Sequence, residues 1–271
     1  MNKRKGIRLF VVDLDETLIG LDLKISKRNT QAVRKLMRKG VNVTIASGRT
    51  FQTTLPFGKH LGVKLPLICY HGALVRTEHK VYIERMLPEQ YYASLIHFAR
   101  SHGVQICFYV SHHNVIYFNR PLDRFGKQYL DKIEQVREIT LVDLSTYTLM
   151  RTPIKCMMIG SPERINLLYE LAKKKWGRGM YITISRPTLL EFLHPAVNKG
   201  AAVEFVAKKA GIPLSQVAVI GDSYNDVPMF KVAGTSIAVR NAPRQVERHA
   251  DHVVASYDHD GVAEAIEQFV V

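Results

Sequence analysis

The sequence has few cysteines and no long apolar segment, and these two absences exclude several classes of protein. Its three cysteines, Cys69, Cys107 and Cys156, are widely spaced within apolar runs, so we predict buried free thiols rather than a disulfide framework or a zinc site. No stretch approaches the ~18 apolar residues of a membrane-spanning helix. The apolar run after the basic start is also too short for a secretory signal, so we expect a cytoplasmic protein that does not bind membranes.

Acidic residues are also scarce relative to basic ones: 24 Asp and Glu against 38 Lys and Arg give a net charge of +14. A positive charge of this size attracts anions, including nucleic acids. The basic residues are scattered, however, and their densest runs, Lys3–Lys5 and Lys173–Lys175, have neither interleaved aromatics nor zinc-finger spacing. We therefore expect a solvated face or a preference for small anionic substrates, without a nucleic-acid partner. A non-catalytic polyanion-binding protein is the alternative, and the oligomeric state is open.

The first quarter of the sequence alternates between strand and helix patterns. Three apolar runs, Leu9–Val12, Val41–Ala46 and Pro66–Tyr70, suit strands that are buried on both faces of a parallel sheet. Between the first two runs, Ser26 is a suitable helix cap and Gly40 a suitable helix stop. This order predicts an α/β fold with a doubly wound, mostly parallel, Rossmann-like sheet.

The strand and helix order predicts two domains, which 271 residues can accommodate. The pattern changes near Leu87 to a strand-rich α+β segment and returns to strand–helix alternation after Pro195. We therefore predict a core domain formed by residues 1–86 and 191–271. Residues 87–190 would form an α+β domain inserted into it.

The segment Arg8–Leu18 is the most informative, because four apolar residues lead directly into two aspartates. Ligands of open α/β sheets bind beyond the carboxyl ends of the strands, where Asp13 would lie. If the extended backbone continues, Asp13 and Asp15 point to the same side, and the two carboxylates repel each other unless a proton or a cation neutralises them. Mg2+ is a hard cation that prefers such oxygen ligands. The alternative is an acidic turn in which Thr17 caps a local group.

A second acidic cluster, Asp222 and Asp226, follows another apolar run at Val217–Ile220. It stands some two hundred residues after Asp13, so only the sheet can bring the two clusters together. If they meet, they form a metal cage from both ends of the chain.

Two further segments have groups that can bind an anion. Ser47-Gly48-Arg49 follows a predicted strand and is predicted to open a helix, whose N-terminus binds phosphate oxygens well. A simple turn is the alternative there. Lys199 begins another predicted helix. A lone lysine at such a place is usually exposed to solvent, but an anionic site needs a compensating cation.

The segments DLDET, SGR, NKG and GDSYND, in this order, resemble the four motifs of haloacid dehalogenase-like (HAD) hydrolases. The insert between the second and third motifs resembles that of the Cof-type, subclass IIB phosphatases. The resemblance covers nearly the whole chain. It implies a Mg2+-dependent phosphatase that hydrolyses phosphate monoesters of small metabolites, such as sugar phosphates, and whose inserted domain is a substrate-specificity cap. A phosphomutase on the same fold is the alternative enzyme.

The resemblance also implies a role for each motif residue. Asp13 would be the nucleophile that forms an aspartyl-phosphate, and Asp15 the general acid and base. The side chains of Asp13 and Asp222 and the backbone carbonyl of Asp15 would hold Mg2+, with Asp226 in support. The phosphate-binding residues would be Ser47, Gly48, Lys199 and Asn225.

Three details of the sequence have more than one interpretation or lie outside the motifs. His71 stands where the family often has asparagine, and it could contact substrate or fill a local turn. Arg240 stands where glycine is common, and it could add charge near the site or point to water. The adjacent His112 and His113 would point to opposite faces of a strand, so we expect a polar turn rather than a metal site.

Overall fold

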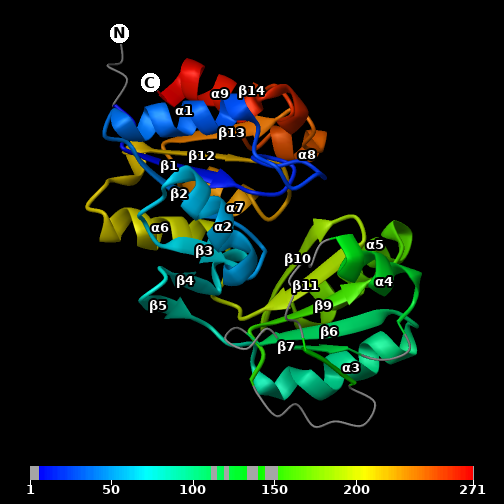
Figure 1. Cartoon of the computed structure of the whole chain (residues 1–271). Coiled ribbons are helices and arrows are strands. Elements are labelled where there is room, and N and C mark those ends of the chain that lie inside the picture. The colour runs from blue at the N-terminus through cyan, green and yellow to red at the C-terminus, as the bar shows by residue number, and fades with distance from the viewer. Residues whose placement is uncertain (1–5, 111–114, 119–121, 133–139, 144–151, 271) are drawn as a thin grey trace. The chain divides into compact units, whose positions relative to one another are not determined.

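In the computed structural model, the chain folds into two compact units (Figure 1). Unit 1 consists of Met1–Ile83 and Asn198–Val271, and unit 2 of Glu84–Val197. Unit 2 therefore includes a few residues that the sequence-based division assigned to the core. The pair His112 and His113 lies outside the described residues. The structure describes residues 6–110, 115–118, 122–132, 140–143 and 152–270.

Unit 1 is built on an eight-stranded sheet with the strand order β14-β13-β12-β1-β2-β3-β4-β5. Strand β1 is buried along its whole length and pairs in parallel with both β2 and β12. The pairs β2–β3, β12–β13 and β13–β14 are also parallel, whereas β3–β4 is antiparallel. The predicted α/β fold with a mostly parallel sheet is confirmed. The strands are β1 Leu9–Asp13, β2 Asn42–Ala46, β3 Leu67–Cys69, β4 Leu74–Arg76, β5 Val81–Glu84, β12 Val217–Gly221, β13 Thr235–Val239 and β14 His252–Val254.

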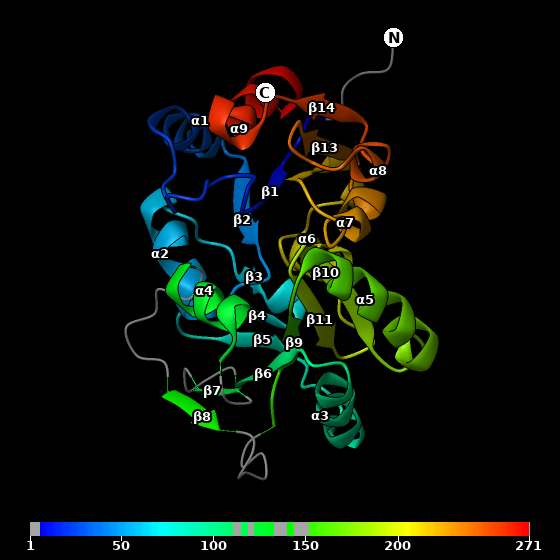
Figure 2. The same cartoon turned by 90° about the vertical axis from the view of Figure 1, so that its right-hand side faces the viewer.

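Helices cover both faces of this sheet, as a doubly wound fold requires (Figures 1 and 2). On one face, Val203 and Val206 of α6 pack in a core with Val11 and Val219 of the central strands. Helices α1 and α9 contact each other on the opposite face. The helices of unit 1 are α1 Lys27–Arg38, α2 Phe51–Leu61, α6 Lys199–Lys209, α7 Val227–Val232, α8 Arg244–Glu247 and α9 Gly261–Ala265.

The observed ends of α1 agree with the ends predicted from the sequence, whereas the observed start of α2 differs from the predicted one. Ser26 Oγ accepts a hydrogen bond from Asn29 N at 3.0 Å, and Gly40 ends the turn after α1 with φ 87°. Helix α2 begins only at Phe51, because Thr50 caps it by accepting a bond from the backbone N–H of residue 53. The predicted helix opening at residues 47–49 is therefore a loop that precedes the helix.

Unit 2 is built on a six-stranded sheet with the order β10-β11-β9-β6-β7-β8, antiparallel except for the pair β7–β8. Its helices α3 and α5 supply Phe98 and Trp176, whose rings meet edge to face at 5.1 Å in an apolar core. This unit has the α+β character that the sequence predicts. Its elements are α3 Tyr92–Ser101, β6 Gln105–Val110, β7 Val115–Phe118, α4 Arg124–Lys132, β8 Thr140–Asp143, β9 Lys155–Ile159, α5 Pro162–Trp176, β10 Tyr181–Arg186 and β11 Leu189–Leu193.

Two expectations from composition can be compared with the structure. Cys69, Cys107 and Cys156 are buried and not in disulfide bonds, as predicted, and burial raises the pKa of Cys69 to about 12. Among the described residues, no helix has the length and apolar character needed to cross a membrane.

Candidate active site

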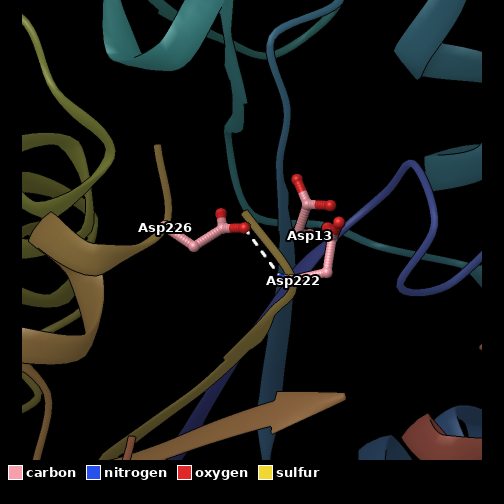
Figure 3. Close-up of side chains that lie close together, drawn as sticks. All are labelled: Asp13, Asp222 and Asp226. Atoms are coloured by element: carbon pink, nitrogen blue, oxygen red, sulfur yellow. Dashed lines mark hydrogen bonds between the residues drawn. The ribbon is translucent and has the colours of Figure 1, made fainter. Parts of the chain in front are cut away.

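Two neighbouring parallel strands lead into acidic residues at the same edge of the unit 1 sheet. Strand β1 ends at Asp13, and β12 ends directly before Asp222, with Val12 and Ile220 in register. One carboxylate oxygen from each of Asp13, Asp222 and Asp226 lies within 4.8 Å of the other two (Figure 3). The structure thus brings together the two acidic clusters that are far apart in the sequence.

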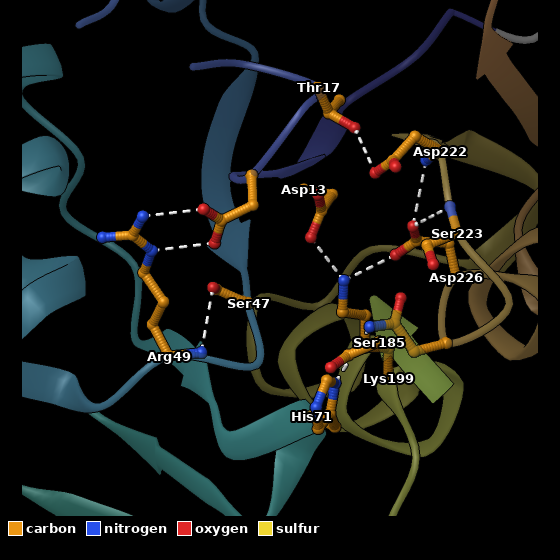
Figure 4. Close-up of polar contacts among 12 residues, drawn as sticks. Asp13, Thr17, Ser47, Arg49, His71, Ser185, Lys199, Asp222, Ser223 and Asp226 are labelled. Atoms are coloured by element: carbon orange, nitrogen blue, oxygen red, sulfur yellow. Dashed lines mark hydrogen bonds and ion pairs between the residues drawn. The ribbon is translucent and has the colours of Figure 1, made fainter. Parts of the chain in front are cut away.

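Lys199 lies inside this acidic cluster rather than in solvent. Its side chain is fully buried, and Nζ donates hydrogen bonds to Asp13 Oδ1 and, at 2.6 Å, to Asp226 Oδ1 (Figure 4). Asn198 fixes the start of α6 by accepting a bond from Ala201 N at 2.8 Å. Burial alone favours the neutral amine, but the two carboxylates raise the pKa of Lys199, so the side chain is a fixed cation.

Asp226 organises the loop that follows β12. Its Oδ2 accepts hydrogen bonds from the backbone N–H groups of Asp222 at 3.0 Å and Ser223 at 2.9 Å, while Oδ1 accepts from Lys199. A Cβ at Gly221 would lie 2.4 Å from the Asp226 carboxyl carbon, so only glycine allows this approach. Because both oxygens of Asp226 already have protein partners, this residue is suited to orienting the cluster.

The cluster carries more negative than positive charge. Burial raises the pKa of Asp13 to about 7, against the opposing effect of Lys199, and the neighbouring Asp226 raises it further. Burial and the neighbouring carboxylates of Asp13 and Asp226 also raise the pKa of Asp222. Three carboxylates around one lysine leave an excess of two negative charges when all are ionised. An all-oxygen donor set with this excess fits a divalent cation.

The Asp15 carboxylate is near enough to Asp13 to help raise its pKa, but it faces Arg49. Strand β1 ends at Asp13 and Leu14 lies in a turn, so the extended backbone that would align the two aspartates does not continue. The Asp15 carboxylate instead accepts two bonds from Arg49, from Nε at 2.8 Å and from Nη2 at 2.7 Å. This bidentate pair compensates the charge of Asp15 locally. We did not identify Arg49 as a site residue, although it belongs to the SGR motif.

The loops after β2 and β3 pack against each other beside the cluster. Ser47 is buried, and its Oγ accepts a bond from Arg49 N at 3.1 Å. His71 is fully buried with φ 55°, and its backbone N–H donates to Ser47 O at 3.0 Å. A Cβ at Gly48 would lie 2.4 Å from the His71 ring, whose Nδ1 is 3.3 Å from Asn225 Nδ2. His71 therefore fills the space between two of the predicted phosphate-binding residues.

Thr17 and Arg240 are placed differently from each other. Thr17 is buried and donates from Oγ1 to Asp222 Oδ1 at 3.0 Å, so it links the two acidic loops instead of capping a local turn.

Arg240 is 66% exposed, and its Nη1 lies 4.0 Å from Glu247 Oε1, so its side chain points to water.

The sequence profile of the haloacid dehalogenase-like hydrolases matches residues 10–266, and the chain belongs to this family. It is 28% identical over 267 residues to 5-amino-6-(5-phospho-D-ribitylamino)uracil phosphatase YcsE of Bacillus subtilis (strain 168), covering 98% of this chain and 96% of that protein. It is also 28% identical over 267 residues to phosphoglycolate phosphatase of Archaeoglobus fulgidus, covering 98% of this chain and 97% of the relative. These names support the predicted enzyme class, a phosphatase.

The fold is that of known members of the family. The solved structure of a HAD subclass IIB sugar phosphatase superposes with a TM-score of 0.84 over 97% of this chain and 100% of that chain, at 20% identity. The resemblance that the four motifs indicated is thereby confirmed at the level of family and fold.

Proposed function

We propose that this protein is a Mg2+-dependent phosphatase that hydrolyses phosphate monoesters of small metabolites through an aspartyl-phosphate. The observation that carries the proposal is the position of Asp13, a buried carboxylate at a strand end that is hydrogen-bonded to Lys199 within a cluster of excess negative charge. Such a cluster is costly to a fold unless charge of opposite sign is supplied, so it indicates a ligand site.

In the proposed first step, an Asp13 oxygen attacks phosphorus while the bond to the leaving oxygen breaks, and Asp15 gives that oxygen its proton. In the second step, water attacks phosphorus, Asp15 takes a proton from it, and the bond to Asp13 breaks to release phosphate. In the structure both Asp15 oxygens accept from Arg49, so Asp15 has to take up a proton and release one of these two bonds before it acts as the acid.

The proposed ligands of Mg2+ are the side chains of Asp13 and Asp222 and the backbone carbonyl of Asp15, with Asp226 orienting the loop. When bound, the ion supplies the charge neutralisation that lets an anionic carboxylate approach an anionic phosphate. Without compensation, two unit charges ~4 Å apart repel by about 4 kcal/mol at an effective dielectric constant of ~20.

Ser47, the Gly48 N–H, Lys199 and Asn225 are the proposed partners of the phosphoryl oxygens. Their support is that they surround the cluster from three different segments of unit 1: Lys199 bonds Asp13, and His71 links Gly48 to Asn225. Phosphoryl transfer depends mainly on such positioning and on electrostatic stabilisation.

Chemistry that the named relatives share supports this substrate class. One is named for a ribitylaminouracil phosphate and the other for phosphoglycolate, and both compounds are phosphate monoesters with different organic parts. The role of residues 87–190 as a substrate-specificity cap is part of this proposal. Its support is their insertion between the second and third motifs.

Purified protein should release inorganic phosphate from p-nitrophenyl phosphate with Mg2+ and not with EDTA. Asp13→Asn should abolish this release because the amide is not a nucleophile, whereas the exposed Asp22→Asn should be unaffected. Full activity of Asp13→Asn, or activity in EDTA, would contradict the proposal. Activity that needs a bisphosphorylated activator and releases little phosphate would identify a phosphomutase instead.

A further inference from the structure

Unit 1 contains a cavity at the opposite end of its sheet from Asp13. The cavity has a volume of about 610 Å3 and is lined by α1, α2 and the start of β2. In the β1–β2 pair, Leu9 is in register with Asn42, which lines the cavity, whereas Asp13 is in register with Ala46. The length of the strands therefore separates this cavity from the acidic cluster.

The cavity has an apolar floor and a basic rim. Its volume lies in the range of ~300–1,000 Å3 that is typical of sites for small molecules. The floor residues are buried or partly buried, and they are Met37, Val41, Val43, Leu61 and Leu65. The rim residues are exposed, and they are Arg34, Arg38, Lys59, His60 and Lys64.

Part of the positive charge of the rim is already compensated. Lys59 forms an ion pair with Glu78 at 2.5 Å. Helices α1 and α2 both end beside the cavity, and each C-terminus is equivalent to about half a negative charge. Arg34 donates to the backbone carbonyl of His60 at 2.5 Å, which satisfies one such end.

The rest of the charge is not compensated. Arg34, Arg38, Lys59 and Lys64 together face one carboxylate and two helix ends, so about two positive charges remain. Arg38 and Lys64 have no ion pair with any residue that the structure describes. The excess equals the charge of a phosphate monoester dianion.

We propose that this cavity is a second anion site, which binds a phosphate monoester whose organic part packs on the aliphatic floor, and a nucleoside monophosphate is the probe. Arg38 lies in the last turn of α1, and arginine can bind phosphate oxygens in a bidentate manner. The phosphate lies between Arg38 and Lys64, and the organic part lies on the apolar floor. This inference does not depend on the proposed catalytic function.

The test is titration calorimetry with adenosine 5′-monophosphate in EDTA, which prevents metal-dependent turnover. The full chain is compared with Arg38→Glu/Lys64→Glu and with Lys174→Glu/Lys208→Glu, which changes the net charge equally at exposed positions of α5 and α6. We expect the first variant to lose affinity at least about tenfold and the second to change by less than about twofold. Adenosine and inorganic phosphate should each bind more weakly than the nucleotide.

Four outcomes would overturn the inference. Absence of nucleotide binding would reject it directly, and binding unchanged in Arg38→Glu/Lys64→Glu would place the nucleotide elsewhere. Equal weakening in both double variants would show general attraction by net charge. Adenosine binding as tightly as the nucleotide would show an apolar site without anion recognition. Circular dichroism and cooperative urea unfolding confirm that each variant is folded.

Discussion

Each unit of this protein contains a buried lysine that is paired with carboxylate, but the charge balance differs. In unit 2, Lys155 and Glu191 form a pair at 2.7 Å, with side-chain exposures of 5% and 3%, and the Lys155 ammonium lies 4.6 Å from the centre of the Tyr109 ring. In unit 1, Lys199 is surrounded by Asp13, Asp226 and, in the same cluster, Asp222. Burial of charge is common to both, so it does not by itself indicate function.

The difference lies in what each group needs from outside the chain. In a buried pair of one cation and one anion, the two charges compensate each other within the fold. Replacing such a pair by apolar residues often leaves the free energy of unfolding unchanged. A lysine among three carboxylates remains negative and favours a proton or a cation as a further partner. An unbalanced group at a strand end is therefore the stronger sign of a reaction centre.

The largest expected effect is that of Lys199→Met. The variant leaves Asp13 and Asp226 buried without their cation, which should cost about 3–5 kcal/mol of unfolding free energy in the metal-free protein. It also removes a proposed partner of the transferring phosphoryl group, so kcat/KM should fall about 10²–10³-fold. Urea unfolding and p-nitrophenyl phosphate kinetics measure the two effects. Unchanged activity in a folded variant would remove Lys199 from the site.

The corresponding change in unit 2 should affect stability and can be reversed. Lys155→Met leaves Glu191 buried without its ion-pair partner and should cost about 3–5 kcal/mol. The double variant Lys155→Met/Glu191→Leu should recover most of that loss, because no unpaired charge is left. Urea unfolding of the three proteins tests this. If the double variant is as unstable as the single one, the pair is not the self-contained group that the comparison assumes.

Metal binding should depend on pH at the acidic cluster. The pKa of Asp13 is raised from 3.8 to about 7, so the folded metal-free protein holds this proton more tightly than the unfolded chain does. The resulting stability is fully present below pH 3.8 and is lost as the pH rises through about 7. Mg2+ binds the ionised carboxylate, so its stabilising effect should be larger at pH 8 than at pH 5.

Thermal unfolding with and without Mg2+ at the two pH values measures this effect. Asp13→Asn is the control, because it has no proton to exchange at this position and should retain only the part of the pH dependence that Asp222 contributes. An equal Mg2+ effect at both pH values in the unmodified protein would show that the ion binds elsewhere.

Much of the fold could be predicted from the sequence because its signals are local. Continuous apolar runs indicated the buried parallel strands, and Ser26 and Gly40 marked the ends of α1 through hydrogen bonding and backbone conformation that involve few neighbours. The start of α2 was missed because Ser47 forms its own turn with Arg49 N, while Thr50 competes successfully as the helix cap.

The residues of the candidate site could be predicted better than the hydrogen bonds and ion pairs that their side chains form. Motifs at strand ends identified Asp13 and Asp222, because parallel topology brings such ends together. Their partners depend on side-chain directions that the sequence does not contain. The Arg49–Asp15 pair and the hydrogen bond from Thr17 to Asp222 are both long-range contacts of this kind.

The smallest expected effect concerns His71, which we interpret as a positioning residue between Gly48 and Asn225. Gly48→Ala places a Cβ against the His71 ring and should raise KM for p-nitrophenyl phosphate, since the ring must shift and its contact with Asn225 is then disturbed. His71→Asn removes the ring while keeping a residue that tolerates φ 55°. In that background Gly48→Ala should cost less, with a coupling of about 1 kcal/mol in the double-mutant cycle. Strictly additive effects would mean that His71 only fills a turn, and the close approach at Gly48 would then have no part in binding phosphate.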